Sequence, residues 1–289
     1  NRTNNLDFAK NAGAARFAFN WGLNLRIKQY ESDKTSTNAI EQHRLLNSLK
    51  QTEYPWMYEV SKCAPQEALR DLDKAFKNFY RGLKEGTGTG FPKFKKKGEH
   101  DSFRLTGTIK IKGKAIQLPR LGTIRLKEVP KIRGRILSAT ISREADRWYV
   151  SISVEIDCTE PQPIQGDVIG IDLGLTSFAT LSTGEKIQAP KPLAKRLKSL
   201  KRASKKHSRK VKGSLNRKKS VINLSRKHRK IRNIRKDFLH KLSTTLAKTK
   251  SEIVIEDLSV KGLLKNRKLS RHISDAGWYE FRRILEYKT

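Results

Sequence analysis

The chain has 289 residues and carries 63 lysines and arginines against 28 aspartates and glutamates, a formal net charge of +35. Such an excess repels itself in the folded state, so we infer a nucleic-acid partner rather than a merely soluble basic protein or one drawn to acidic membranes. The absence of any run of 18 apolar residues excludes a membrane-spanning helix, and Cys63 and Cys158 form no CxxC pair, which predicts a cytoplasmic protein without a zinc site from these cysteines.

Helical periodicity dominates the first 84 residues. Residues 13–30 and 40–50 are expected helices, and in 64–83 apolar side chains recur at spacings of three and four, as on one stripe of an amphipathic helix. The stripe consists of Leu69, Leu72, Phe76, Phe79 and Leu83. We therefore predict a helical recognition domain over residues 1–84.

A glycine-rich segment, EGTGTGFPKFKKKGEH, occupies residues 85–100. Helices and strands both tolerate this mixture of glycine, proline and lysine poorly. The GTGTG run is similar to a phosphate-binding loop, but no Lys-Ser or Lys-Thr pair completes one. The segment is expected to be a flexible linker.

Between about Ser102 and Ile156 the hydrophobic period changes to two, with a hairpin reversal at residues 142–148. Many short strands at close spacing predict a small β-barrel, which we assign to a domain over residues 85–160. Basic side chains on the faces outside the core are expected to grip a nucleic-acid backbone, with a solvated face as the alternative reading. They are Lys110, Lys112, Arg125, Lys127, Arg133 and Arg135.

The connector TEPQPIQG, residues 159–166, marks a domain boundary, and a third domain is expected over 161–289. It begins with DVIGID, a continuous apolar strand at residues 167–172. The runs SFATLS and EKIQA follow it, separated by a turn at Thr183-Gly184. This order predicts an antiparallel hairpin that starts with a buried strand.

Between Lys191 and Lys250 the chain has 24 lysines and arginines and one acidic residue, Asp237. Apolar residues nevertheless repeat helically there, so we predict two basic helices joined by KKHSRKVKGSLNRKK, with a solvated coiled-coil arm as the alternative. One face would pack on the protein while the others lie against phosphates. The residues expected on the nucleic-acid backbone are Lys201, Arg202, Lys205, Arg209, Arg226, Arg229, Arg232 and Arg235.

The next predicted strand lies in SEIVIEDLS, residues 251–259, and its apolar run ends at Glu256 and Asp257. A helix is expected from about Ser274, with Asp275 near its N-terminus as a candidate cap.

Asp172 and Glu256 each lie at the C-terminal end of a short apolar strand. An acid buried at such a position costs free energy unless a helix dipole, an arginine or a metal ion compensates it. If the two strands are neighbours, the carboxylates converge, and at about 4 Å they repel by about 4 kcal/mol at an effective dielectric of about 20. A divalent metal relieves that repulsion, and beside phosphates Mg²⁺ held by carboxylates supports phosphodiester cleavage.

Two other readings remain open for these acids. GIDLG also resembles the strand-turn-strand start of nucleotide-binding proteins of the actin and sugar-kinase type, where the acid handles Mg-ATP. No second glycine-rich phosphate loop follows, and the charge is unlike that of a cytosolic ATPase. Glu256 could also be a surface acid beside Lys261.

Several motifs together resemble the TnpB family of transposon-encoded, RNA-guided DNA nucleases related to type V CRISPR effectors. They are GAARFAFNWGL, GFPKFKKKG, GIDLG, RKDFLHKLSTTLAK and the block from IVIEDLS to LEYK, and they span nearly the whole chain in the expected order. The resemblance implies an α+β multidomain fold with a helical recognition lobe, a wedge-type β-barrel and an RNase H-like (RuvC) nuclease domain into which basic helices are inserted.

The resemblance also implies roles for individual residues. Asp172 and Glu256 match the first two acids of the family's catalytic Mg²⁺ site, and Lys62 and Gln66 match positions that read the short motif flanking the DNA target. A third catalytic aspartate and a four-cysteine ribbon that binds Zn²⁺ are expected after LEYK, beyond Thr289, where this sequence ends. The implied partners are a guide RNA and double-stranded target DNA, bound by a monomer in a prokaryotic, nucleoid-associated setting.

The predicted function is therefore Mg-dependent, RNA-guided cleavage of target DNA next to a short flanking motif, with base pairing carrying the sequence specificity. The alternative is a nuclease-inactive, RNA-guided DNA-binding protein of the repressor type; survival of both acids favours cleavage. A guide-free nuclease or transposition factor would not need so much basic surface between the two acids.

Overall fold

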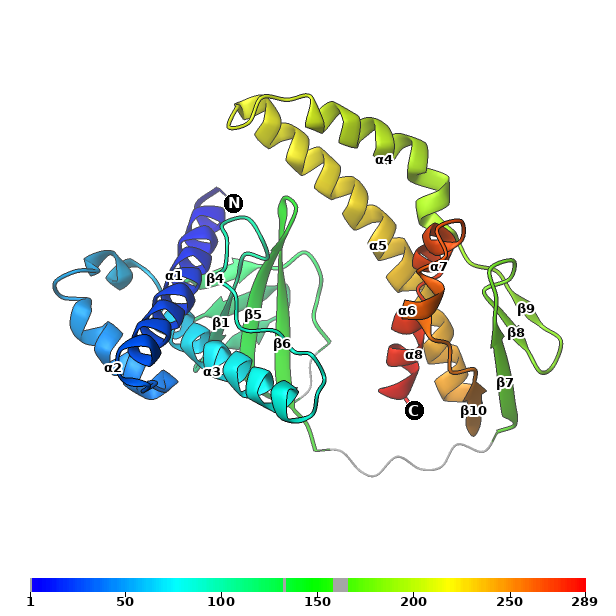
Figure 1. Cartoon of the computed structure of the whole chain (residues 1–289), viewed down its shortest axis with the longest axis horizontal. Helices are drawn as coiled ribbons and strands as arrows, with labels where there is room; N and C mark the ends of the chain where they lie inside the picture. Colours follow the sequence, from blue (N-terminus) through cyan, green and yellow to red (C-terminus); the bar gives the residue numbers. More distant parts are fainter. Residues whose placement is uncertain (1, 132–133, 158–165) are drawn as a thin grey trace. The chain divides into compact units, whose positions relative to one another are not determined.

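The computed structural model describes residues 2–131, 134–157 and 166–289. The chain divides into two compact units, Asn1–Cys158 and Thr159–Thr289, and each is described by itself (Figure 1). None of the helices in the described part of the chain is both long enough and apolar enough to cross a membrane. The predicted connector 159–166 lies almost wholly outside the described residues.

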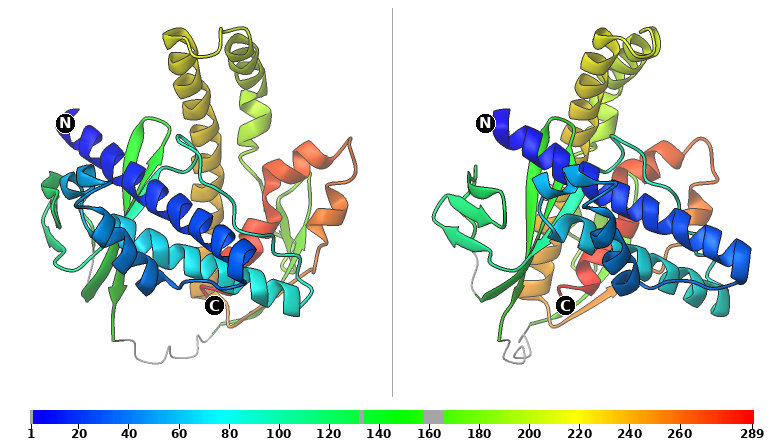
Figure 2. Two further views of the ribbon diagram at one scale, coloured as in Figure 1. Left: turned by 60° about the vertical axis from the view of Figure 1, so that its left-hand side comes forward. Right: turned by 90° about the vertical axis from the view of Figure 1, so that its left-hand side faces the viewer.

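The first unit begins with four helical segments, α1 (Arg2–Asp33), α2 (Ala39–Leu49), the 3₁₀ helix η1 (Pro55–Glu59) and α3 (Cys63–Lys84). They confirm the three predicted helices, although α1 begins and ends beyond 13–30. Helix α3 packs on α1, and the two run alongside each other in both views of Figure 2. Leu69, Leu72 and Phe76 are buried as the stripe predicts, whereas Leu83 is 63% exposed because the stripe ends with the helix.

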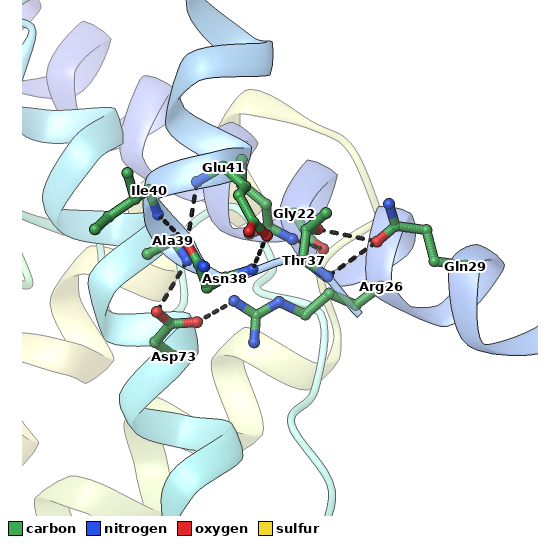
Figure 3. A network of polar contacts seen from close by, with 10 residues as sticks. Gly22, Arg26, Gln29, Thr37, Asn38, Ala39, Ile40, Glu41 and Asp73 are labelled. Atoms are coloured by element: carbon green, nitrogen blue, oxygen red, sulfur yellow. Dashed lines mark hydrogen bonds and ion pairs between the residues drawn. The ribbon is translucent and has the colours of Figure 1, made fainter. Parts of the chain in front are cut away.

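A network of polar contacts fixes α2 against α1 and α3 (Figure 3). The Asp73 carboxylate on α3 accepts a bond from the Arg26 guanidinium of α1 and one from the backbone N–H of Ala39, at 2.9 Å. Asn38 caps α2 in a capping box with Glu41, which satisfies N–H groups at the helix start. The direction in which α2 leaves α1 is thereby set by side chains on both neighbouring helices.

The predicted linker has neither helix nor strand between residues 87 and 101, in line with its composition. It is not free of the fold, however. Phe91 packs edge-on against Phe76 and Phe79, and Lys95 lies over the Phe19 ring with its backbone bonded to Asn20. The expectation of a flexible linker is corrected on this point, because Phe91 contacts α3 and Lys95 contacts α1.

The strands of the first unit form two antiparallel three-stranded sheets. One joins β1 (Ser102–Thr106), β5 (Arg135–Glu144) and β6 (Arg147–Glu155) in the order β1-β5-β6, and the other joins β2 (Lys110–Lys112), β3 (Ala115–Leu118) and β4 (Gly122–Arg125). The predicted reversal is confirmed, since Glu144 pairs with Arg147. Hydrogen bonds between the described strands do not join the two sheets into one ring, and the wedge-type barrel stays a prediction. Strands and helices share one hydrophobic core.

The second unit contains a four-stranded sheet in the order β10-β7-β8-β9. Strands β7 (Val168–Leu173), β8 (Ala179–Leu181) and β9 (Lys186–Ile187) are successive antiparallel neighbours, which confirms the predicted hairpin, and β10 (Glu252–Ile255) runs parallel to β7. Between β9 and β10 come the two predicted basic helices, α4 (Pro192–Ser208) and α5 (Leu215–Thr249).

Three shorter helices follow β10: α6 (Val260–Leu263), α7 (Ser270–Ala276) and α8 (Trp278–Glu286). The second core joins the sheet to the C-terminal half of α5 and to α8, where Phe178 contacts Phe238 and Phe281 edge-on. The single helix expected from Ser274 is interrupted at Gly277, which has φ = 77° and both ends α7 and begins α8.

Candidate functional site

The register of β7 and β10 brings the two predicted acids together. Ile255 is the partner of Ile171, so Asp172 within β7 and Glu256 directly after the end of β10 each follow a paired residue. Neighbouring strands lie about 4.8 Å apart. Side chains alternate between faces along β7, which assigns the Asp172 carboxylate to the face opposite Ile169 and Ile171, the residues that enter the core. Glu256 lies directly after the C-terminal end of β10.

Both acids are exposed, and this corrects the expectation of a buried acid at Asp172. The apolar run suggested a strand buried on both faces, but only alternate residues of β7 enter the core. Water solvates the two carboxylates, so the fold needs no arginine or helix dipole to stabilise them in the absence of other ligands.

A pocket of about 370 Å³ opens beside Glu256 at the C-terminal ends of the two strands. Its walls include Leu173 and Ile255 from the strands and Trp278 and Arg282 from α8. The Arg282 guanidinium donates to the carboxylates of Asp257 and Glu286. Among the described residues, no ion pair joins Arg282 to Glu256. Helix α8 therefore forms a wall next to Glu256, whereas Asp172 does not line this pocket.

The donor set fits a hard divalent cation. Mg²⁺ prefers oxygen ligands and is commonly held by one or two carboxylates together with phosphate oxygens of the substrate. The described residues contain no group of three or more His, Cys, Asp or Glu side chains placed to hold a metal, so this part of the chain offers two carboxylates.

Helices α4 and α5 pack against each other as a basic hairpin. Lys227 Nζ donates to Ser199 Oγ across it at 2.6 Å, and His207 Nδ1 and Ser220 Oγ lie 2.8 Å apart near its turn. Figure 2 shows the hairpin extending away from the sheet. Of the residues predicted on a nucleic-acid backbone, six are exposed: Lys201, Arg202, Lys205, Arg209, Arg226 and Arg232.

Arg229 is partly buried, and Arg235 takes part in a contact that the sequence did not reveal. Asp275 on α7 is 7% exposed; its carboxylate accepts bonds from Arg235 Nη2 and from the backbone N–H groups of Leu193 and Ala194, each at 3.0 Å. Asp275 is thus a cap, but of α4 and not of the helix expected at its own position. The available signal was the run DAGW at residues 275–278. The donors to Asp275, which are Arg235, Leu193 and Ala194, lie far from it in the sequence.

Lys62 and Gln66 lie together at the start of α3 in the first unit. Lys62 is the exposed N-cap residue, and Gln66 follows one turn later, half-buried. Side chains four residues apart share one face of a helix, so the geometry allows both to reach one ligand.

The fold and the site define a strongly basic α+β protein that presents two adjacent carboxylates at a parallel strand pair. Residues 151–267 match the family described as "Probable transposase" and residues 6–35 the family described as "Helix-turn-helix domain", although the latter lie mostly in the single helix α1. The chain belongs to the TnpB family.

Two relatives illustrate the match. The chain is 34% identical to a protein of Escherichia coli K12 named "Putative RNA-guided DNA endonuclease InsQ", over 96% of this chain and 72% of that protein. It is 36% identical to a "Putative RNA-guided DNA endonuclease" of Streptomyces pristinaespiralis, over 98% and 70%. A Cas12f1 chain from a complex with sgRNA and target DNA aligns over 97% of this chain and 76% of that one, at 14% identity and a TM-score of 0.28.

Proposed function

We propose that the protein is an RNA-guided DNA endonuclease that cuts target DNA next to a short flanking motif by Mg-dependent phosphodiester hydrolysis. The observation that supports the proposal is the parallel pairing of β7 with β10, because the exposed residues Asp172 and Glu256 each come one position after the paired residues Ile171 and Ile255. The names of the relatives support the guide RNA and the DNA target.

The topology of the second unit supports a RuvC-like site. Three antiparallel strands are followed by a fourth that returns parallel to the first, giving the order β9-β8-β7-β10. This agrees with the RNase H-like domain that the resemblance implies, with α4 and α5 inserted before the returning strand. In that reading Asp172 belongs to the first strand of the sheet and Glu256 directly follows the fourth.

Asp172 and Glu256 would hold Mg²⁺, which when bound activates a water and stabilises the oxygen that leaves phosphorus. The chain's own part is to fix the two carboxylates on adjacent strands and to leave their face open to a strand of DNA. Carboxylates alone would repel phosphates, so the basic hairpin is needed to hold the backbone close.

Replacing Asp172 tests the assignment. Asp172→Asn removes one charged ligand while keeping the size of the side chain, so we expect guide-loaded protein to lose cleavage of a matched target with Mg²⁺ present. Binding of guide RNA and target should stay within about twofold of the parent, since the exposed residue stabilises no part of the core. The measurement pairs a nicking assay with a gel-shift titration. Asp167→Asn serves as the control, because this exposed aspartate lies just before β7, at the opposite end of the strand from Asp172.

Loss of RNA binding in Asp172→Asn would show that the residue is structural and not catalytic. A parent protein that binds guide and target tightly but never nicks would establish the alternative, an RNA-guided DNA-binding protein of the repressor type.

A further inference from the structure

One group of side chains in the first unit contains more cations than the described acids balance, since the one ion pair that its described members make joins Arg70 to Glu67. It lies where the C-terminal end of α2 meets the N-terminal part of α3, and we call it the α2–α3 cation cluster. Its members are His43, Lys50, Lys62 and Arg70.

Lys50 is the anomaly of the cluster. It is 9% exposed, yet its ammonium group bonds only to the Asn47 side-chain oxygen, with no carboxylate forming an ion pair among the described residues. Burial lowers the pKa of Lys50, and the charge of Lys62 lowers it further. Lysine is almost never fully buried without an ionic partner, because its charge loses hydration.

A chain of hydrogen bonds links Lys50 to His43. Asn47 accepts from Lys50 and, through its side-chain amide N–H, donates to His43 Nε2 at 3.3 Å, so this nitrogen must be unprotonated. Burial lowers the pKa of His43, followed by the charges of Lys50, Arg70 and Lys62. The charges that lower the pKa of His43 are therefore all cationic.

The surroundings relieve this repulsion at Arg70 and leave the charges of Lys50 and Lys62 without an ion pair among the described residues. Glu67, the first acidic residue along α3, forms an ion pair with Arg70 at 2.8 Å and lies 4.0 Å from Arg104. The first turn of α3 contains no acidic residue, so the positive end of its dipole adds to the same potential. The Asp73 network in Figure 3 holds α2 in place and so keeps the cations together.

We propose that the α2–α3 cation cluster binds a phosphodiester group of the target DNA, next to the bases that Lys62 and Gln66 would read. The choice of DNA rests on the proposed function; the existence of a phosphate site does not. Phosphate contacts fix the register of a protein on a duplex, so this one would position the motif-reading side chains. Because the bound anion favours the charged imidazole, binding takes up a proton at His43 Nε2, which then no longer accepts from the Asn47 amide.

The first experiment needs no nucleic acid. The imidazole signals of the full chain's six histidines are titrated by NMR in inorganic phosphate and in chloride of equal ionic strength. We expect phosphate to raise the midpoint of His43, assigned with His43→Gln, while exposed His100 moves little, and Lys50→Met to abolish the difference. Equal midpoints in the two salts would overturn the site.

Lys50→Met also separates a ligand site from a structural lysine. Methionine keeps most of the apolar stem and removes a buried, unbalanced charge, so the apo variant should unfold at a higher temperature than the parent. A lower unfolding temperature would show that Lys50 serves the fold.

The second experiment measures the affinity of guide-loaded protein for motif-bearing duplex DNA. Lys50→Met should weaken binding at least about tenfold and reduce the salt slope by about one unit, the contribution of one phosphate, whereas exposed Lys74→Met should do neither. Parent affinity should rise at least about threefold from pH 7.5 to 6.0, and His43→Gln should lose this rise. A loss confined to guide RNA would overturn the DNA assignment; a parent that binds no target contradicts the proposed function and leaves the phosphate titration to decide the site.

Discussion

At the scale of single residues, position in a strand decides which acids are free to act. Asp172 is exposed because β7 alternates, whereas Asp275 is buried because three donors from two other helices converge on it. The two aspartates look equally isolated in sequence, but one meets solvent and the other holds α4 and α5 to α7. Removing one partner of a buried, bonded charge pair is costly because it leaves the other uncompensated.

Asp275→Ala should therefore lower the free energy of unfolding of the second unit by about 3 kcal/mol. Hydrogen exchange should locate the loss, because the amides of Leu193 and Ala194 lose their acceptor. The matched control is Asp237→Ala, whose ion pair with Lys241 is exposed and should change stability by less than about 0.5 kcal/mol. Equal effects of the two substitutions would contradict a capping role for Asp275.

At the scale of helices and strands, local periodicity found most elements but not their breaks. The spacing of Ile273, Trp278, Phe281 and Leu285 resembles one helix, yet Gly277 adopts a left-handed conformation that turns the chain between α7 and α8. A Cβ there would lie 3.0 Å from Arg235 Cδ. The close approach of Arg235 is what makes glycine necessary, and it comes from α5, a different part of the chain.

Gly277→Ala should lower stability by more than the cost of the left-handed backbone alone, which is about 1–2 kcal/mol. Gly184→Ala supplies the comparison, because its φ of 88° is similar and nothing lies within 4 Å of the added Cβ. Thermal unfolding of both variants measures the difference. If Gly277→Ala and Gly184→Ala lose equal stability, the contact between the added Cβ and Arg235 contributes nothing to the free energy of unfolding.

The sequence predicted the helices, the strand hairpins and the position of Asp172 and Glu256 at the ends of two strands, because periodicity and strand ends are local properties. It did not predict the Asp73 and Asp275 networks, the anchoring of Phe91 or the burial of Lys50. Each depends on partners brought together by packing between distant segments. Asp172 was assigned correctly to a strand end but wrongly to the interior, since an apolar run does not reveal which residues alternate outward.

At the scale of the whole molecule, the net charge of +35 is distributed unevenly, with 24 of the basic residues between Lys191 and Lys250. Within the second unit they lie on the hairpin, which extends beyond the sheet. A surface of this kind attracts phosphates by releasing their counterions, a contribution that falls linearly with the logarithm of salt concentration. The hairpin should therefore dominate the salt dependence of guide binding.

Replacing Lys201, Arg202 and Lys205 together with glutamine should reduce the salt slope of guide RNA binding by about 2 to 3 units, since each phosphate contact contributes about 0.7 to 0.9. The control keeps the charge with Lys201→Arg, Arg202→Lys and Lys205→Arg and should retain the parent slope. Fluorescence anisotropy between low and moderate salt gives both values. An unchanged slope in the glutamine variant would mean that the exposed face of α4 does not touch RNA.

The pairing of β7 with β10 also imposes an order in time. Glu256 is synthesised 84 residues after Asp172, a delay of roughly 4 to 17 s at ordinary bacterial rates of translation. Helix α4 and then α5 are made during that interval, and α5 is complete at Thr249, seven residues before the first acid gains its neighbour. A nascent chain can thus encounter RNA on its finished cationic arm before it possesses a complete carboxylate pair.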